Sequence, residues 1–258
     1  MRSVEDFARV AELLRRGLND CDIARRTGVP RTTVRDWRRG RRAREPRVCL
    51  GVDRACVRCG EPAHDFAGLP GEPYSYLLGL YLGDGHLALS RKKVWHLRIF
   101  LDLRYPGIVD ECATAMQSLF PSQPAGRYWP RDAAMVVVYM WSKQWGCLIP
   151  QHGRGPKHRR LIQLADWQQR HVDRHPEALL RGLIHSDGWR GTNVVTARRR
   201  RYRYPRYTFC NVSSDIRAIF CQACDKLGIE WRQMNERNIS VAKRGSVERL
   251  DGFIGRKR

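Results

Sequence analysis

The sequence LLGLYLGDG occupies residues 77–85, and a related sequence, LRGLIHSDG, occupies residues 180–188. Each reads as an apolar helix that ends in an aspartate followed by a glycine. Small residues lie four positions apart in both copies, and four residues make about one helical turn, so each pair lies on one helix face. A face without side-chain bulk lets two backbones approach closely. The two copies therefore predict two helices that pack directly against each other.

The two terminal acids, Asp84 and Asp187, are placed unfavourably for stability. A carboxylate at a helix C-terminus faces the negative end of the helix dipole. If the helices pack side by side, the two carboxylates also repel each other unless a cation lies between them. A local rule broken twice in the same way indicates a functional site, here a divalent-metal site of the kind used in phosphodiester cleavage. The terminal glycines, Gly85 and Gly188, fit the left-handed residue that commonly closes a helix. The alternative is two core helices with ordinary glycine caps.

Both stretches resemble the motif of the LAGLIDADG homing endonucleases. They keep the family's glycine at the third position and its closing Asp-Gly, but Leu82 and His185 replace the family's earlier acid, which is not its metal ligand. The resemblance covers about residues 74–256. It implies a single-chain pseudo-dimer whose antiparallel sheets form a saddle over the DNA major groove. It also implies that Asp84 and Asp187 hold Mg2+ (or Mn2+) and that one monomer cuts both strands.

Hydrophobic periodicity predicts an α+β fold with the same element order in both halves: helix, two strands, helix, two strands, helix. We expect the first half over residues 74–150, and a connector plus the second half over residues 151–258. Two lysines end the last strand of each half: Lys143 lies 59 positions after Asp84, and Lys243 lies 56 positions after Asp187. We expect these lysines to neutralise developing charge. A solvated surface charge is the equal alternative for each.

The composition points to a polyanionic partner. The chain has 258 residues, with 48 Lys and Arg against 26 acids, for a net charge of +22. This excess favours double-stranded DNA as the partner. No run of 18 apolar residues indicates a membrane span, and no apolar signal core follows the first residues, so we expect a cytoplasmic protein.

Residues 1–45 predict a helix-turn-helix domain. Three short helices are expected, at residues 4–16, 21–27 and 31–38, with a glycine in the last turn. The pattern resembles the resolvase and transposase type of this motif. The third helix should present Arg31, Thr32, Thr33 and Arg35 to base edges. A small helical protein–protein module is the alternative.

Residues 46–73 form a predicted linker with a possible zinc clip. Its candidate ligands are Cys49, Cys56, Cys59 and His64, which fall within sixteen residues. A tetrahedral site with three cysteines and one histidine is chemically sensible. Free thiols in a linker are an equal alternative.

The saddle should carry basic residues towards DNA, some to phosphates and some to base edges. The candidates are His86, Arg91, Lys92, Lys93, His96 and Arg98 in the first half, and Arg190, Arg198, Arg199, Arg200, Arg201, Arg203, Arg206 and Tyr207 in the second.

The first hypothesis for function is a site-specific, metal-dependent DNA endonuclease of the homing type that acts as a monomer. The second is a transcription regulator that uses the same fold without cutting, because fold does not fix function. Two intact acids argue against the second, since carboxylates aimed at phosphates weaken DNA binding. A recombinase accessory protein is the third, and it rests on the N-terminal domain alone.

Overall fold

The computed structural model describes residues 4–39, 56, 59–60, 64–131, 133–197, 200–255 and 257. The chain divides into two compact units, Met1–Asp53 and Arg54–Arg258. None of the helices in the described part of the chain is long and apolar enough to cross a membrane.

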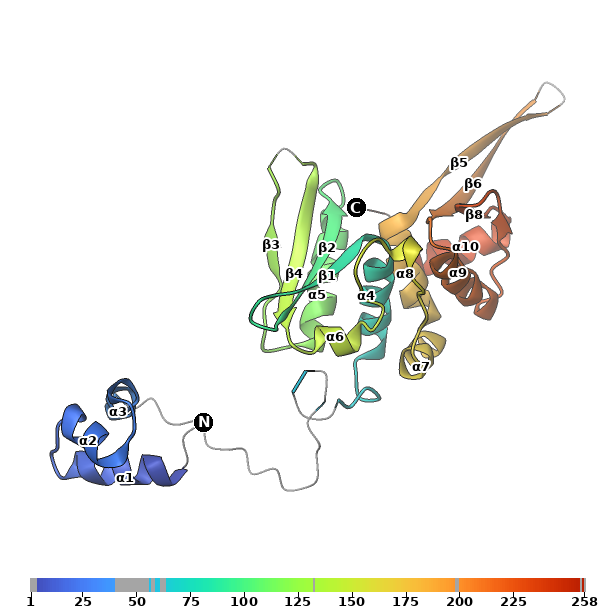
Figure 1. Cartoon of the computed structure of the whole chain (residues 1–258). Coiled ribbons are helices and arrows are strands. Elements are labelled where there is room, and N and C mark those ends of the chain that lie inside the picture. The colour runs from blue at the N-terminus through green and yellow to red at the C-terminus, as the bar shows by residue number, and fades with distance from the viewer. Residues whose placement is uncertain are drawn as a thin grey trace. The chain divides into compact units, whose positions relative to one another are not determined.

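The N-terminal unit contains three helices, α1 (Val4–Arg15), α2 (Asp20–Thr27) and α3 (Arg31–Arg38) (Figure 1). The Asn19 side chain accepts hydrogen bonds from the backbone of the first turn of α2, and the left-handed Gly28 closes that helix. The shared core consists of Val10, Ile23, Val29 and Val34. The three helices follow the predicted periodicity because each sends apolar side chains into this one small core.

The second unit repeats one order of elements twice, as the sequence predicts. The first half comprises α4 (Gly71–Asp84), β1 (Gly85–Leu89), β2 (Trp95–Asp102), α5 (Pro106–Leu119), β3 (Gly126–Tyr128), β4 (Met135–Ser142) and α6 (Trp145–Leu148). The connector holds a 3-10 turn, η1 (Lys157–Arg159), and α7 (Asp166–Arg174). The second half comprises α8 (Pro176–Asp187), β5 (Gly188–Ala197), β6 (Arg200–Cys210), α9 (Ser214–Lys226), β7 (Arg232–Gln233), β8 (Asn238–Val241) and α10 (Arg244–Ile254). The α+β class is confirmed.

Each half contains one antiparallel sheet, with strand orders β1-β2-β4-β3 and β5-β6-β8-β7. Side chains alternate between the two faces of a strand. In β2, Leu97, Ile99 and Leu101 are buried towards the helices, whereas the side chains between them, such as His96 and Arg98, lie on the other face. We call this second face of each sheet the open face.

Helices α4 and α8 lie side by side at the centre of the second unit (Figure 1). Their backbones touch: a Cβ added to Gly79 would lie 2.5 Å from the Leu179 carbonyl oxygen, and one added to Gly182 would meet the Tyr76 carbonyl oxygen at 2.2 Å. A Cβ on Gly83 would clash with Ser186. The close packing predicted from the small residues is therefore confirmed.

The glycines that follow the two helices are not left-handed, so that expectation is wrong. Gly85 has φ −88° and ψ 149°, and Gly188 has φ −101° and ψ 159°, which are extended values. Each helix runs directly into a strand instead of into a left-handed cap. A Cβ at Gly85 would lie 2.4 Å from the Tyr81 Cα, and one at Gly188 would lie 2.6 Å from the Ile184 Cα. Close approach of the chain to the last helical turn requires these glycines.

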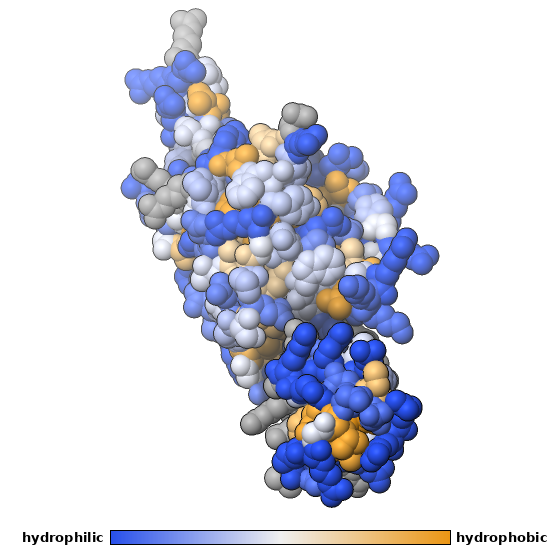
Figure 2. Space-filling model, turned by 90° about the vertical axis from the view of Figure 1, so that its left-hand side faces the viewer, coloured by the Kyte–Doolittle hydropathy of each residue, from blue (hydrophilic) through white to orange (hydrophobic). Residues whose placement is uncertain are grey.

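Strands β5 and β6 extend beyond the rest of their sheet as a two-stranded ribbon (Figure 1). They pair from Gly188↔Phe209 to Ala197↔Arg200, but β8 joins only residues 207–210 of β6. Strand β6 therefore begins at Arg200, within an arginine-rich stretch of the sequence. Residues 200–205 are exposed, and hydrophilic residues dominate the face of the molecule drawn in Figure 2.

Candidate functional site

Helices α4 and α8 bring Asp84 and Asp187 together, because each acid is the last residue of its helix. A Cβ on Gly83 would lie 3.0 Å from Asp187 Oδ2, so the Asp187 carboxylate lies against the end of α4. Burial, and secondly the charge of Asp187, raise the pKa of Asp84 to about 6, while Lys157 and Lys257 oppose the rise. Burial also raises the pKa of Asp187.

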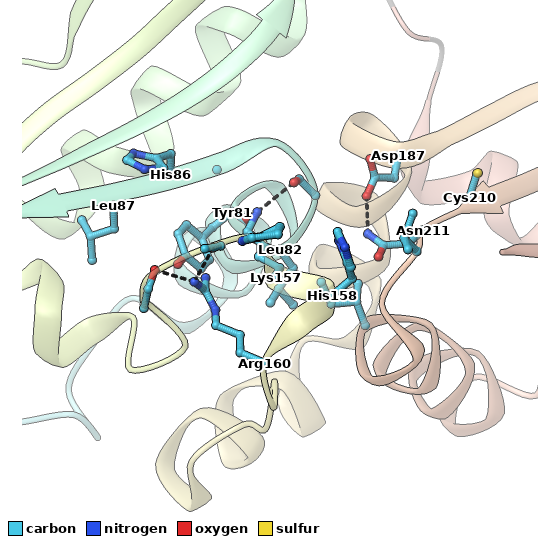
Figure 3. A pocket seen from close by; sticks show the side chains of 17 residues that line it. Tyr81, Leu82, His86, Leu87, Lys157, His158, Arg160, Asp187, Cys210 and Asn211 are labelled. Atoms are coloured by element: carbon cyan, nitrogen blue, oxygen red, sulfur yellow. Dashed lines mark hydrogen bonds between the residues drawn. The ribbon is translucent and has the colours of Figure 1, made fainter.

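The two carboxylates differ in one contact. Asn211 Nδ2 donates a hydrogen bond of 2.6 Å to Asp187 Oδ2 (Figure 3), and this bond opposes the rise in the pKa of Asp187. The strand registers Gly85↔Ile99 and Gly188↔Phe209 place Leu101 at the corresponding position of the first half. Leucine has no donor, so the two halves are not equivalent at their acids.

Two lysines that the sequence analysis did not select reach the C-terminal ends of these helices. Lys157 Nζ donates to the carbonyl oxygens of Tyr81 and Gly83, the second at 2.8 Å. Lys257 Nζ donates to the carbonyl oxygens of His185, at 3.1 Å, and Gly188, at 2.6 Å. Burial lowers the pKa of both lysines to about 8, while the two aspartates oppose the shift. The site therefore combines two acids with two bases.

The lysines expected beside the aspartates, Lys143 and Lys243, lie elsewhere. Both are exposed, and Lys243 forms an ion pair with Glu230. The positive charges that act on Asp84 and Asp187 come from Lys157 and Lys257. The physical reason is that the chain after each half's last helix folds back over the motif helices, which strand position alone does not reveal.

Each aspartate lines a cleft to which both halves contribute residues. A cleft of about 410 Å³ combines Asp187 and Asn211 with first-half residues that include Gly83 and His86, and Lys157 from the connector (Figure 3). A second cleft, of about 250 Å³, combines Asp84 with second-half residues that include Ser186 and Gly188, and with Lys257. The paired acids thus sit between two clefts, one on each side of the helix pair.

The donor set suits a hard divalent cation. Carboxylate oxygens are the ligands that Mg2+ and Mn2+ prefer. The raised pKa values of the two carboxylates show that their surroundings do not fully stabilise the negative charges. A cation bound between them would supply that stabilisation. Asp84 and Asp187 are the residues of this site that can hold such an ion.

His185 is a packing residue in α8. Its Nε2 lies 3.3 Å from the Ile254 carbonyl oxygen, so Nε2 carries the proton and Nδ1 accepts from the Tyr76 hydroxyl at 3.0 Å. Burial lowers the pKa of His185 to about 4. The histidine is therefore neutral at pH 7 and has both ring nitrogens engaged.

The open face of the first sheet is more aromatic than basic. Arg98 pairs with His86 across β1 and β2, at 2.9 Å between Nη2 and Nδ1. His96 stacks on Trp141 of β4 with ring centroids 3.8 Å apart. The remaining predicted residues of this half, Arg91, Lys92 and Lys93, lie exposed in the turn that joins β1 to β2.

Two of the predicted contacts in the second half do not lie on the open face. Arg190 and Tyr207 pair across β5 and β6 on the helix side, where both bind Asp251 of α10. Tyr207 is 1% exposed. The structure thus gives both side chains a partner within the protein, and their contact with DNA stays a prediction.

The ribbon carries the other basic candidates of this half. Arg200, Arg201 and Arg203 are exposed, and Arg206 is half-buried. Between them the rings of Tyr202 and Tyr204 stack, with centroids 6.2 Å apart. Arg198 and Arg199 lie outside the described residues.

On α3 the predicted base-reading residues form an outward face. Arg31, Thr32 and Arg35 are exposed, Thr33 is half-buried, and Val34 points into the core.

Of the predicted zinc ligands, Cys49 lies outside the described residues, while Cys56, Cys59 and His64 lie together.

Residues 4–46 match the family described as a Homeodomain-like domain. The match covers this homeodomain-like domain only, and no curated protein matches the chain.

Solved structures resemble the chain in fold. The homing endonuclease I-DmoI in complex with DNA and Mn has 14% identity and a TM-score of 0.47, over 72% of this chain and 98% of that chain. The N-terminal LAGLIDADG domain of DUF199/WhiA has 13% identity and a TM-score of 0.44, over 75% of this chain and 87% of that one. The LAGLIDADG meganuclease I-AabMI bound to uncleaved DNA has 10% identity and a TM-score of 0.45, over 70% and 82%.

Proposed function

We propose that this protein is a site-specific DNA endonuclease of the LAGLIDADG homing type that requires a divalent metal. The observation that carries the proposal is the meeting of Asp84 and Asp187 at the ends of two tightly packed helices, between two clefts. Each acid lines its own cleft between the two halves, so in this proposal one chain offers one site for each strand of a duplex.

Asp84 and Asp187 would hold Mg2+ or Mn2+. When bound, such an ion polarises a phosphate and lowers the pKa of a bound water molecule. Lys157 and Lys257 hold the carbonyl ends of the two motif helices and so fix the positions of both acids. Their positive charges, next to each cleft, also favour the approach of a phosphate.

DNA binding is distributed over both units in this proposal. A two-stranded ribbon fits the major groove, and the exposed arginines and tyrosines of the β5–β6 ribbon suit phosphate contact and stacking. The outward face of α3 in the homeodomain-like domain supplies a second contact with base edges. The net charge of +22 supports a nucleic-acid partner for the whole chain.

A second candidate function is a DNA-binding transcription regulator that does not cut. One observation favours it: Lys157 and Lys257 place two positive charges beside the two carboxylates. With both lysines protonated, the site is charge-balanced without a metal. The two candidates therefore differ in whether the protein binds a divalent metal at this site and breaks DNA.

The test is cleavage of genomic DNA by the purified full-length protein with Mg2+, with the ends mapped by sequencing. Asp84→Asn and Asp187→Asn are run beside the wild type, and Asp166→Asn, at an exposed aspartate of α7 outside both clefts, serves as the matched control. We expect recurrent double-strand ends with a fixed short overhang, unchanged in the control. Each aspartate variant should lose the double-strand breaks. If the protein binds DNA at defined sites without breaking it, and the aspartate changes do not affect this binding, the endonuclease is excluded and the transcription regulator is supported.

A further inference from the structure

A second cluster of ligand atoms lies in the second unit, outside the site built on the aspartates. Its four residues are Cys56, Cys59 and His64, which precede α4, and Cys147 of α6. One ligand atom from each lies within 4.8 Å of the other three. The fourth member, Cys147, comes from more than eighty residues further along the chain, so spacing between cysteines could not select it.

The distances within the cluster fit a tetrahedral metal centre. The Cys56 and Cys147 sulfurs are 3.7 Å apart, and the Cys59 sulfur is 3.2 Å from His64 Nε2. With Zn–S bonds of about 2.3 Å and Zn–N bonds of about 2.0 Å, tetrahedral angles place two sulfurs about 3.8 Å apart and a sulfur and a nitrogen about 3.5 Å apart. A disulfide requires about 2.05 Å between its sulfurs, so the 3.7 Å between the Cys56 and Cys147 sulfurs is not a disulfide.

The surrounding contacts hold the ligands in place. Gly60 has φ 69°, and its backbone N–H donates to the Cys56 carbonyl oxygen at 2.8 Å, which forms the tight turn of a Cys-x2-Cys knuckle. Phe66, two residues after His64, stacks on Trp167 of α7 at 4.2 Å. Cys147 is buried in α6. The ligands are thus carried by one turn, one helix and one segment packed on a second helix.

We propose that Cys56, Cys59, His64 and Cys147 bind one structural Zn2+ ion. Four protein ligands fill a tetrahedral shell, so no position remains for water or substrate, and thiolate ligands select zinc over Mg2+. The ion fastens the segment before α4 to the base of the first half. This segment follows the linker to the homeodomain-like domain, so the ion would fix the position at which that linker ends. The inference does not depend on DNA cleavage.

The experiment measures metal content and coordination in the full-length protein. Zinc per chain is determined by mass spectrometry, and Co2+ replaces zinc to report the coordination by its visible absorption. We expect one zinc per chain, the d–d bands of tetrahedral Co2+ and a thiolate-to-cobalt charge-transfer band.

Three variants locate the ligands. Cys147→Ala should lose the zinc and the tetrahedral cobalt bands, whereas Cys112→Ala, a buried cysteine of α5 outside the cluster, should keep both. Cys49→Ala should also keep both, because Cys147 and not Cys49 is the fourth ligand. Cys147→His supplies a different zinc ligand at the same place and should retain the metal if Cys147→Ala merely fails to fold.

Two results would overturn the proposal. One is a wild-type protein that is folded by circular dichroism, contains no zinc and gives no tetrahedral cobalt spectrum. The other is full zinc occupancy in Cys147→Ala with loss in Cys49→Ala, which would assign the fourth ligand to the linker. Retention of zinc in Asp84→Asn separates this metal from the one proposed between the aspartates.

Discussion

At the scale of single residues, the charged form of Asp84 is destabilised by its surroundings. Its folded-state pKa of about 6 lies above the value of 3.8 for an exposed aspartate. The native state therefore binds more protons than the unfolded state between these values, so stability falls as pH rises from about 4 to 6. At pH 7 in EDTA the charged form costs up to about 3 kcal/mol.

We expect Asp84→Asn to be more stable than the wild type at pH 7 in EDTA, because the variant has no buried charge at this position. The gain should shrink towards pH 4, and urea unfolding at both pH values measures it. Added Mg2+ should stabilise the wild type and not the variant. Equal stability at pH 7 without metal would contradict the burial argument.

Lys157 offers a second test at this scale. Lys157→Met keeps an apolar stem but removes the charge that opposes the raised pKa of Asp84. We expect the pKa of Asp84 to rise further, measured by NMR titration of the carboxyl carbon. Lys143→Met changes an exposed lysine outside the site and should leave the titration unchanged. A shift of the Asp84 pKa of equal size in both variants would show that the effect is not specific to Lys157.

The sequence identified the acids but not the bases. Asp84 and Asp187 stand in a recurring motif, whereas Lys157 and Lys257 stand in irregular segments whose path periodicity does not encode. A signal was available: Lys157 follows Asp84 by 73 positions and Lys257 follows Asp187 by 70. Because side chains alternate along a strand, Tyr207 and Arg206 must face opposite sides of the sheet. Arg190 pairs with Tyr207 and therefore lies on the side of Tyr207.

At the scale of elements, the contact between α4 and α8 governs the site, because it sets how close the acids lie. Gly79→Ala forces a Cβ against the Leu179 carbonyl oxygen and should cost about 3 kcal/mol or more. Gly252→Ala is the control, since a Cβ there meets nothing within 4 Å and alanine favours helix. Urea unfolding should show a large loss for the first and none for the second. A wild-type midpoint for Gly79→Ala would contradict the close packing.

Strands β5 and β6 contain two arginines whose substitution should have different effects, one on DNA binding and one on stability. Arg203→Ala removes an exposed charge and should weaken DNA binding, with a salt dependence reduced by about one phosphate contact. Arg190→Ala leaves Asp251 without its bidentate partner and should instead lower thermal stability. Fluorescence anisotropy over a salt series and thermal unfolding separate the two effects. The opposite pattern would mean that the ribbon is not the DNA-binding surface.

The sequence predicted most elements of the second unit because their apolar periods are long and regular. The arginine-rich sequence at the end of the β5–β6 ribbon has no apolar period, so periodicity does not predict strands there. In the structure the ribbon projects beyond its third strand, where no core selects apolar residues, and backbone pairing and the stacked rings of Tyr202 and Tyr204 maintain it.

At the scale of the whole molecule, the division into two compact units lets the proposed contributions of each unit to DNA binding be tested separately. Deleting residues 1–53 removes the homeodomain-like domain and should lower DNA affinity and its salt dependence. It should leave the unfolding of the remaining unit unchanged. Anisotropy and urea unfolding of the shortened and full-length chains measure this. Loss of folding in the shortened chain would show that the second unit depends on the first.

The hydrogen bond from Asn211 to Asp187, with Leu101 at the corresponding place, has a consequence for inheritance. In a symmetric homodimer one codon change alters both ends of the molecule at once. Here both halves lie in one reading frame, so a mutation at residue 101 or 211 changes one acid and spares the other. The two halves of such a gene can diverge independently. The DNA sequence that the protein is proposed to recognise therefore does not have to be a palindrome.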